Sequence, residues 1–196
     1  MNLLALLLSS RIGASDIKEW RPRYLAGLPL YEIYEETYKV ESYLVKYNFY
    51  YENVVFNIPY KKDVINELIK ESYIFSTKKI KDMGVSQSDC KYDLNVHIVQ
   101  VSLDTMNDNS RFKEWRTVNG EYELEVLYGF YDPTINTYRN SIILYSSEAR
   151  DADRVILHEM AHYWYDRFCI YNLSNMKTEA FAKSVENLYI TTKKME

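Results

Sequence analysis

Hydrophobic positions along the chain follow two different spacings, and these spacings predict both strands and helices. Apolar runs rich in β-branched and aromatic residues predict four strands, at residues 49–58, 94–101, 122–131 and 141–145. Apolar residues that recur every three or four positions predict three helices, at residues 61–81, at 151–168 and from 174 or 175 to 189. The order of these elements predicts an α+β fold with a four-stranded mixed sheet, followed by two helices.

The first part of the chain shows helical spacing instead. Apolar positions over residues 30–46 recur at intervals of three and four, which predicts a helix. Ser15 and Asp16 are residues that commonly precede a helix, so a shorter helix is expected from there to residue 20. We therefore expect residues 1–47 to form a helical segment that packs on a main domain of residues 48–196.

The leucine-rich start of the chain, residues 1–8, raises the question of membrane targeting. This stretch is far too short to cross a bilayer, and no Lys or Arg precedes it as in a secretory signal. We therefore expect no membrane span and a cytoplasmic protein, with secretion or association with a virion as the alternatives.

Composition narrows the possible functions. Hydrophobic residues make up 47% of the 196 residues and charged residues 27%, as in ordinary globular domains. The 24 basic and 28 acidic residues give a net charge of −4, and no basic cluster is present to bind phosphate backbones, so nucleic acid is not an expected partner. The two cysteines, Cys90 and Cys169, are too few for a disulfide framework and are not spaced as a metal-binding pair.

Two of the three histidines lie in one short motif, His158-Glu159-Met160-Ala161-His162. On a helix, residues four apart lie on the same face, so both imidazoles can bind one ion while Glu159 lies beside it. Apolar residues flank the motif, which predicts a continuous and mostly buried helix. Burying these polar groups without partners is costly, and a metal ion such as zinc resolves that cost. The alternative is a helix whose polar stripe, with both histidines, faces solvent.

A catalytic zinc site needs a third protein ligand and an open position for water. The best candidate is Glu179, which lies 17 positions after His162 near the start of the last predicted helix. The small residues Ala180 and Ala182 allow the two helices to approach closely, as short metal–ligand distances require. The sequence therefore predicts a zinc site formed by His158, His162 and Glu179.

Three other residues are alternatives for the third ligand: Asp166, Glu186 and His97. Asp166 lies four residues after His162, but its side chain is short, so a hydrogen bond that orients His162 from outside the ligand set is the better expectation. His97 lies in a predicted strand, where a histidine in the core is more common than a metal ligand.

The His-Glu-x-x-His motif, with Glu179 in a Glu-Ala-Phe-Ala segment, resembles the zincin metallopeptidases, in particular the gluzincins, whose third ligand is a helical glutamate. Similar compact domains occur in phage and bacterial regulators of the ImmA type and in thermolysin-like enzymes. In zincins, a strand, a helix and three further strands form a twisted sheet before the zinc helix. One antiparallel edge strand of that sheet lines the substrate cleft. The resemblance covers about the last 140 residues as architecture, but only about 30 as motif.

The resemblance implies a zinc-dependent endopeptidase that acts on a protein or peptide substrate. Glu159 is then the general base that activates a water molecule, and the substrate is expected to lie along residues 122–131. One departure is Lys183, which stands where many thermolysin-like enzymes have an aspartate that orients a histidine; Asp166 or Glu186 then has to replace it. Tyr171 and Tyr189 are weak candidates for transition-state stabilisation.

Two other functions fit the same residues. A structural or virion-associated protein can retain a zinc site without turnover, and a regulatory module can become an active peptidase only with a partner. Zinc content, measured beside the degradation of an unstructured peptide mixture, separates the first of these from a peptidase. Activity that appears only with cell extract identifies the second. The sequence does not predict the oligomeric state.

Overall fold

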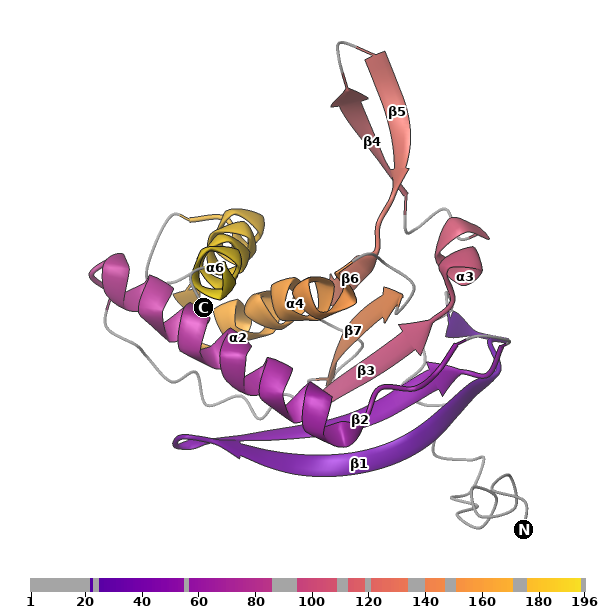
Figure 1. Ribbon diagram of the computed structural model, residues 1–196, viewed down its shortest axis with the longest axis horizontal. Helices are drawn as coiled ribbons and strands as arrows, with labels where there is room; N and C mark the ends of the chain where they lie inside the picture. The colour runs from indigo at the N-terminus through magenta and orange to yellow at the C-terminus, as the bar shows by residue number, and fades with distance from the viewer. Residues whose placement is uncertain are drawn as a thin grey trace.

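The computed structural model describes residues 22, 25–54, 57–85, 95–108, 113–118, 121–133, 140–146, 151–170 and 176–194. Within these ranges the chain forms a five-stranded mixed sheet, a separate pair of strands and four helices (Figure 1). The predicted α+β class is confirmed, but the main sheet has five strands rather than four. The predictions for residues 1–20 lie outside the described part of the chain.

The main sheet begins with a long hairpin, which replaces the helix predicted over residues 30–46. Strand β1 (Leu30–Val40) pairs antiparallel with β2 (Tyr43–Glu52). The helix prediction is wrong because this segment is rich in aromatic and β-branched residues, whose side chains pack well on a pleated sheet. Glu41 has a φ of 54°, a left-handed conformation typical of tight hairpin turns. The expected boundary between residues 47 and 48 falls inside β2, so the hairpin is part of the main sheet.

The centre of the sheet is parallel and its far edge is antiparallel. The strand order is β1-β2-β3-β7-β6, in which β3 (Asn95–Val101) runs parallel to both β2 and β7 (Asn140–Ser146). The last strand, β6 (Gly129–Asp132), runs antiparallel to β7 and forms the edge. The strands predicted over residues 94–101 and 141–145 are confirmed, and β3 is buried on both faces, as is usual for a parallel strand.

The single strand predicted over residues 122–131 is two strands in different sheets. Its first part is β5 (Glu121–Val126), which pairs with β4 (Lys113–Val118), and its last part is β6. The prediction of one continuous strand is wrong because alternating residues indicate a strand but not the strand with which it pairs. In Figure 1 the β4–β5 pair projects away from the main sheet and its helices.

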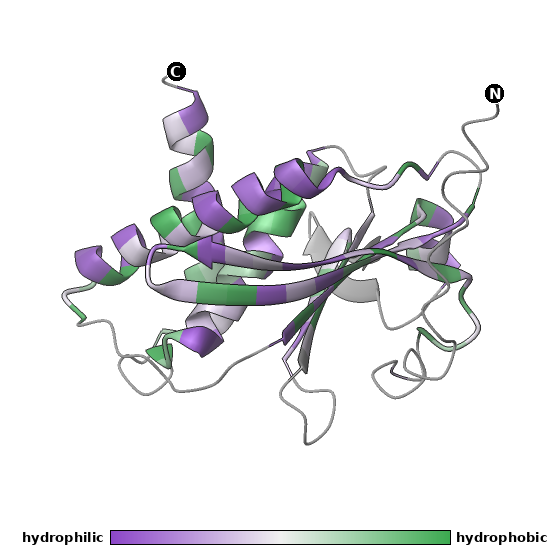
Figure 2. Cartoon of the chain, turned by 90° about the horizontal axis from the view of Figure 1, so that it is seen from below, coloured by the Kyte–Doolittle hydropathy of each residue, from purple (hydrophilic) through white to green (hydrophobic). Residues whose placement is uncertain are grey.

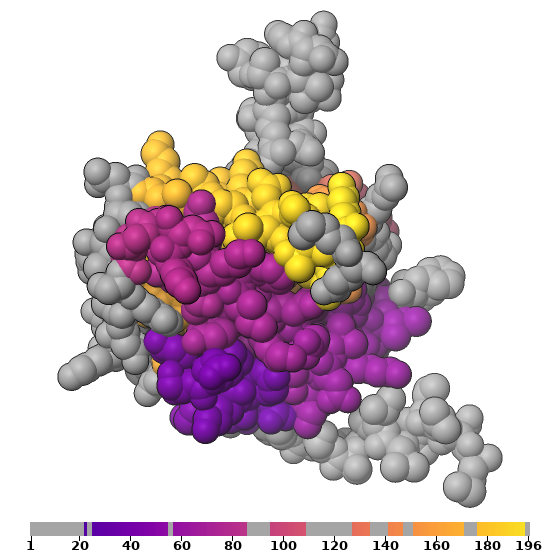
Figure 3. Space-filling model, turned by 60° about the vertical axis from the view of Figure 1, so that its left-hand side comes forward, coloured from indigo at the N-terminus to yellow at the C-terminus, as the bar shows by residue number. Residues whose placement is uncertain are grey.

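Three helices lie together on one face of the main sheet (Figure 1), and a shorter one follows β3. They are α2 (Lys62–Asp82), α4 (Ala152–Arg167), α6 (Thr178–Lys193) and the short α3 (Leu103–Asp108). The helices predicted over residues 61–81 and 151–168 are confirmed, and the last helix begins and ends a few residues later than predicted. In Figure 2 hydrophilic and hydrophobic residues both occur along these helices, as in helices that cover a core. Figure 3 shows α2 and α6 side by side at the surface.

Helix α4 lies at the centre of the hydrophobic core. The ring of Trp164 contacts those of Tyr43, Tyr73 and Phe168. Its indole Nε1 donates a hydrogen bond of 2.9 Å to Oγ of Ser72 in α2. Burial on nearly all sides means that the polar groups of α4 depend on neighbouring elements for their partners.

Candidate metal centre

Helix α4 places His158 and His162 one turn apart, on the side that faces α6. The helix is continuous from Ala152 to Arg167, as the motif requires. The centroids of the two imidazole rings lie 5.1 Å apart. The spacing of four residues therefore has the effect expected from the sequence, because it places both rings on one face.

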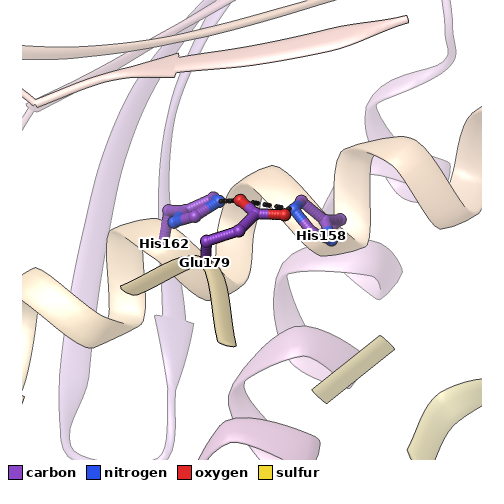
Figure 4. A group of neighbouring side chains, drawn as sticks. All are labelled: His158, His162 and Glu179. Atoms are coloured by element: carbon purple, nitrogen blue, oxygen red, sulfur yellow. Dashed lines mark ion pairs between the residues drawn. The ribbon is translucent and has the colours of Figure 1, made fainter. Parts of the chain in front are cut away.

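Glu179 lies in the first turn of α6, and its carboxylate lies between the two imidazoles (Figure 4). Its Oε2 atom is 3.3 Å from Nε2 of His162 and 3.6 Å from Nε2 of His158. One ligand atom from each of the three residues lies within 4.8 Å of the others. The structure therefore brings together the three side chains that the sequence singled out.

These separations fit a small divalent ion with tetrahedral coordination. With zinc–ligand distances of about 2.0–2.1 Å, two ligand atoms of a tetrahedral site lie about 3.3 Å apart. The distances from Glu179 Oε2 to the two histidine nitrogens, 3.3 and 3.6 Å, are close to that value. Two imidazoles and a glutamate are also a set that catalytic zinc sites use, with a fourth position left for water. The donor atoms thus suit zinc in kind, and their two separations from Glu179 suit it in distance.

Each histidine has a partner for its second ring nitrogen. Nδ1 of His158 lies 3.0 Å from Oε2 of Glu186, and Nδ1 of His162 lies 2.7 Å from Oγ1 of Thr178. Contacts of this kind fix the orientation of an imidazole and leave the Nε2 lone pair for a metal ion. Glu186 was one of two candidates for such a contact, whereas Thr178 was not expected.

Asp166 does not make the hydrogen bond to His162 that the sequence predicts. Its Oδ2 atom accepts a hydrogen bond of 2.9 Å from the hydroxyl of Tyr131 in β6. The prediction is wrong because Nδ1 of His162 faces Thr178 of α6 rather than the next turn of its own helix. The ring of Tyr131 stacks on that of His162, with centroids 5.8 Å apart and planes 8° apart. Asp166 therefore supports His162 through Tyr131.

Glu159 is buried between α4 and the edge strand β6. A Cβ atom at Gly129 would lie 2.6 Å from Oε1 of Glu159 and 2.5 Å from Cγ1 of Val155, so only a glycine allows the strand to lie this close. Burial raises the pKa of Glu159 to about 7, although the charges of His158 and His162 act in the opposite direction. A carboxylate with a pKa near neutrality is suited to proton transfer at neutral pH.

The carboxylates around the histidines are held in their charged form. The hydrogen bond to His162 lowers the pKa of Glu179 to about 2, and the hydrogen bond to His158 lowers the pKa of Glu186. Burial by itself lowers the pKa of His158, but its contact with Glu186 and the charges of nearby carboxylates outweigh burial and raise this pKa. Negative charge therefore surrounds the histidine nitrogens, which favours a cation at this place.

The other residues considered from the sequence have different surroundings. His97 is buried in β3 and does not belong to the candidate metal-binding group. Lys183 forms an ion pair of 3.3 Å with Oε1 of Glu179, so this position contacts the glutamate rather than a histidine. Tyr189 packs against α2, and Tyr171 lies outside the described residues.

Four residues around the site were not expected from the sequence: Thr178, Tyr131, Gly129 and Arg154. Two of them have a signal in their spacing, since Thr178 directly precedes Glu179 and Arg154 lies four residues before His158. Gly129 and Tyr131 have none, because only the pairing of β6 with β7 brings that strand to α4.

Comparisons with known proteins do not identify a relative. No protein-family model, no curated protein and no solved structure matches the chain. The function therefore has to be inferred from the chemistry of the site.

Proposed function

We propose that this chain is a zinc-dependent endopeptidase of the zincin type. The observation that carries the proposal is the convergence of His158, His162 and Glu179 beside the buried carboxylate of Glu159. The side chain of Glu179 is 55% exposed, so solvent and substrate can reach the candidate metal centre from the side of this residue. A ligand set with an adjacent general base is the combination that metal-assisted hydrolysis requires.

The residues around the site have complementary roles in this reaction. Zinc, when bound, supplies a Lewis acid that polarises a carbonyl and lowers the pKa of a coordinated water towards about 7. Glu159 accepts the proton of the attacking water and passes it to the departing amine. Its burial suits this role because desolvation brings its pKa to about 7. Glu186 and Thr178 hold the two imidazoles in the orientation that presents Nε2.

Strand β6 is the edge along which we expect a peptide substrate to lie. The main sheet ends at β6, and its first residue, Gly129, contacts Glu159. An extended peptide that pairs with such an edge gains main-chain hydrogen bonds whatever its sequence. We therefore expect the substrate to lie along residues 129–132 rather than along the whole of residues 122–131.

The order of the elements supports the same proposal. A mixed sheet with an antiparallel edge strand precedes a helix with two histidines and a second helix with a glutamate. This is the order that the resemblance to zincins implies. Strand β1, the short helix α3 and the separate β4–β5 pair are additions to that expectation.

Zinc analysis and an assay with an unstructured protein such as casein test the proposal together. The purified chain is expected to bind one zinc ion and to cleave casein. His162→Ala is expected to lose both properties because it removes a ligand. A chain that binds zinc and cleaves nothing, even with cell extract, is instead a structural or virion-associated protein that retains the site.

Glu159→Gln separates metal binding from catalysis. Glutamine has the same size but cannot accept the proton, so we expect unchanged zinc content and a loss of turnover of at least about 100-fold. The matched control is Glu67→Gln, which changes an exposed glutamate of α2 that pairs with Lys70 and should leave turnover unchanged. Casein hydrolysis by Glu159→Gln at the rate of the parent protein would remove this mechanism.

A further inference from the structure

A series of three side chains leads from the surface of α4 to the candidate metal centre. Nε of Arg154 forms an ion pair of 2.8 Å with Oε1 of Glu186. The other carboxylate oxygen, Oε2, lies 3.0 Å from Nδ1 of His158. The exposed fraction of the side chain falls along this series, from 43% for Arg154 to 19% for Glu186 and 16% for His158. Both oxygens of Glu186 are therefore engaged, one by a permanent cation and one by a metal-site imidazole.

The two helices that carry the proposed ligands also carry this series. Arg154 lies four residues before His158 on α4, so both side chains leave the same face of the helix. Glu186 lies seven residues after Glu179 on α6, which is about two helical turns. The Arg154–Glu186 pair thus joins α4 to α6 close to the place where the metal would join them.

The Arg154–Glu186 pair differs from an ordinary surface ion pair. Exposed pairs contribute little to stability, because water screens them and both side chains lose freedom. Here the acidic partner is mostly buried and its second oxygen contacts His158. A guanidinium is planar and always charged, so it restricts the rotation of the carboxylate that it binds. Loss of Arg154 would therefore release Glu186, and with it the orientation of the imidazole.

We propose that Arg154 is a positioning residue of the metal centre, acting through Glu186 to keep Nδ1 of His158 on the carboxylate and Nε2 directed to the metal. This inference rests on the proposed function, since it requires that the site binds zinc. Arg154 touches none of the three ligand atoms, so its effect on zinc affinity must pass through Glu186.

Zinc affinity, measured by competition with a chromophoric chelator, tests this role. Glu186→Gln is expected to weaken zinc binding by about 10- to 100-fold, and Arg154→Met by about 3- to 10-fold. Arg154→Lys should restore part of the affinity, because an ammonium group still donates to Glu186 but lacks the planar geometry. The matched control is Lys193→Met, which removes another 2.8 Å ion pair of α6, to Glu71 of α2, and should leave zinc affinity unchanged.

A double-variant cycle shows whether Arg154 acts through Glu186. In the Glu186→Gln background, Arg154→Met should weaken zinc binding by less than about 2-fold further, because the two residues form one unit. Independent losses that multiply would overturn the proposal. So would an unchanged zinc affinity in Arg154→Met accompanied by a lower thermal midpoint of the zinc-free protein, which is the result expected of a purely structural pair.

The control experiments distinguish this inference from the proposed function. If the unaltered protein binds no zinc, the proposed function fails and the role of Arg154 fails with it. If the unaltered protein binds zinc and cleaves casein while Arg154→Met binds zinc equally well, only the role of Arg154 is overturned.

Discussion

Gly129 lies at the start of β6, where its Cα faces the side chains of Val155 and Glu159. A Cβ atom there would come within 2.5 Å of Cγ1 of Val155 and 2.6 Å of Oε1 of Glu159. Gly129→Ala is therefore expected to lower the free energy of unfolding by about 1–3 kcal/mol. It should also lower kcat at unchanged zinc content, because it displaces Glu159. Denaturant unfolding, zinc analysis and the casein assay measure these effects.

A second substitution separates the steric clash with Val155 from the steric clash with Glu159 that a Cβ atom at Gly129 would cause. Adding Val155→Ala to Gly129→Ala removes the contact with Cγ1 of Val155 and leaves the one with Glu159. Stability should then recover in part relative to the sum of the single variants, while turnover should stay low. Full recovery of turnover would mean that the glycine serves packing alone.

The buried His97 is expected to make the fold sensitive to acid. Burial lowers its pKa from 6.5 to about 4. As the pH falls below 6.5, the unfolded chain binds a proton that the folded chain does not yet bind. The free energy of unfolding is therefore unaffected by His97 above about pH 6.5, falls by about 1.4 kcal/mol per unit between pH 6.5 and 4, and falls no further below that range.

His97→Leu should remove this component of acid sensitivity. Between pH 7 and pH 4.5 we expect the variant to lose about 2–3 kcal/mol less stability than the parent protein. Urea unfolding of both proteins at the two pH values, in the presence of a chelator, gives the difference. An equal loss in both proteins would contradict the assignment to His97.

At the scale of elements, a buried hydrogen bond links α2 to α4. Nε1 of Trp164 donates to Oγ of Ser72, and both side chains are fully buried. Ser72→Ala leaves the indole N–H without this acceptor and should cost about 1–3 kcal/mol of stability. Thermal or urea unfolding measures the loss. Adding Trp164→Phe should cost less in this background than alone, and strictly additive effects would show that the two groups are not coupled.

The helices and strands also differ in how well the sequence predicts them. The helices over 61–81 and 151–168 were predictable because helical spacing is a local property, with all its hydrogen bonds inside the segment. The hairpin β1–β2 was not, because aromatic residues at helical spacing are equally able to pair across a sheet. The division of residues 122–131 between two sheets was also not predictable, since strand pairing depends on distant segments.

At the scale of the whole molecule, zinc would join α4 and α6 in the folded state alone. Binding should therefore raise the free energy of unfolding, by about 2.7 kcal/mol when free zinc exceeds its Kd 100-fold. The thermal midpoint should rise with zinc concentration and return to its starting value on chelation. His162→Ala should show no such response, and a zinc-binding parent protein without a shift would contradict a site formed only on folding.

Two further features concern the chain as a whole. Cys169, just after α4, is disulfide-bonded. A disulfide restricts the unfolded chain and so adds a stabilising contribution to that of the core. None of the described helices is long and apolar enough to cross a membrane.

The sequence by itself singled out the three residues that form the candidate metal centre. The motif from His158 to His162 requires only a helix to place both imidazoles on one face, and Glu179 was identified from its residue type and its place near the start of the next helix. Only the tertiary structure decided what surrounds those residues: the contact of Gly129 with Glu159, the partners of the histidine rings, and the pair of Arg154 with Glu186. The physical reason is distance along the chain, because side chains from separate elements meet only when the whole core has packed.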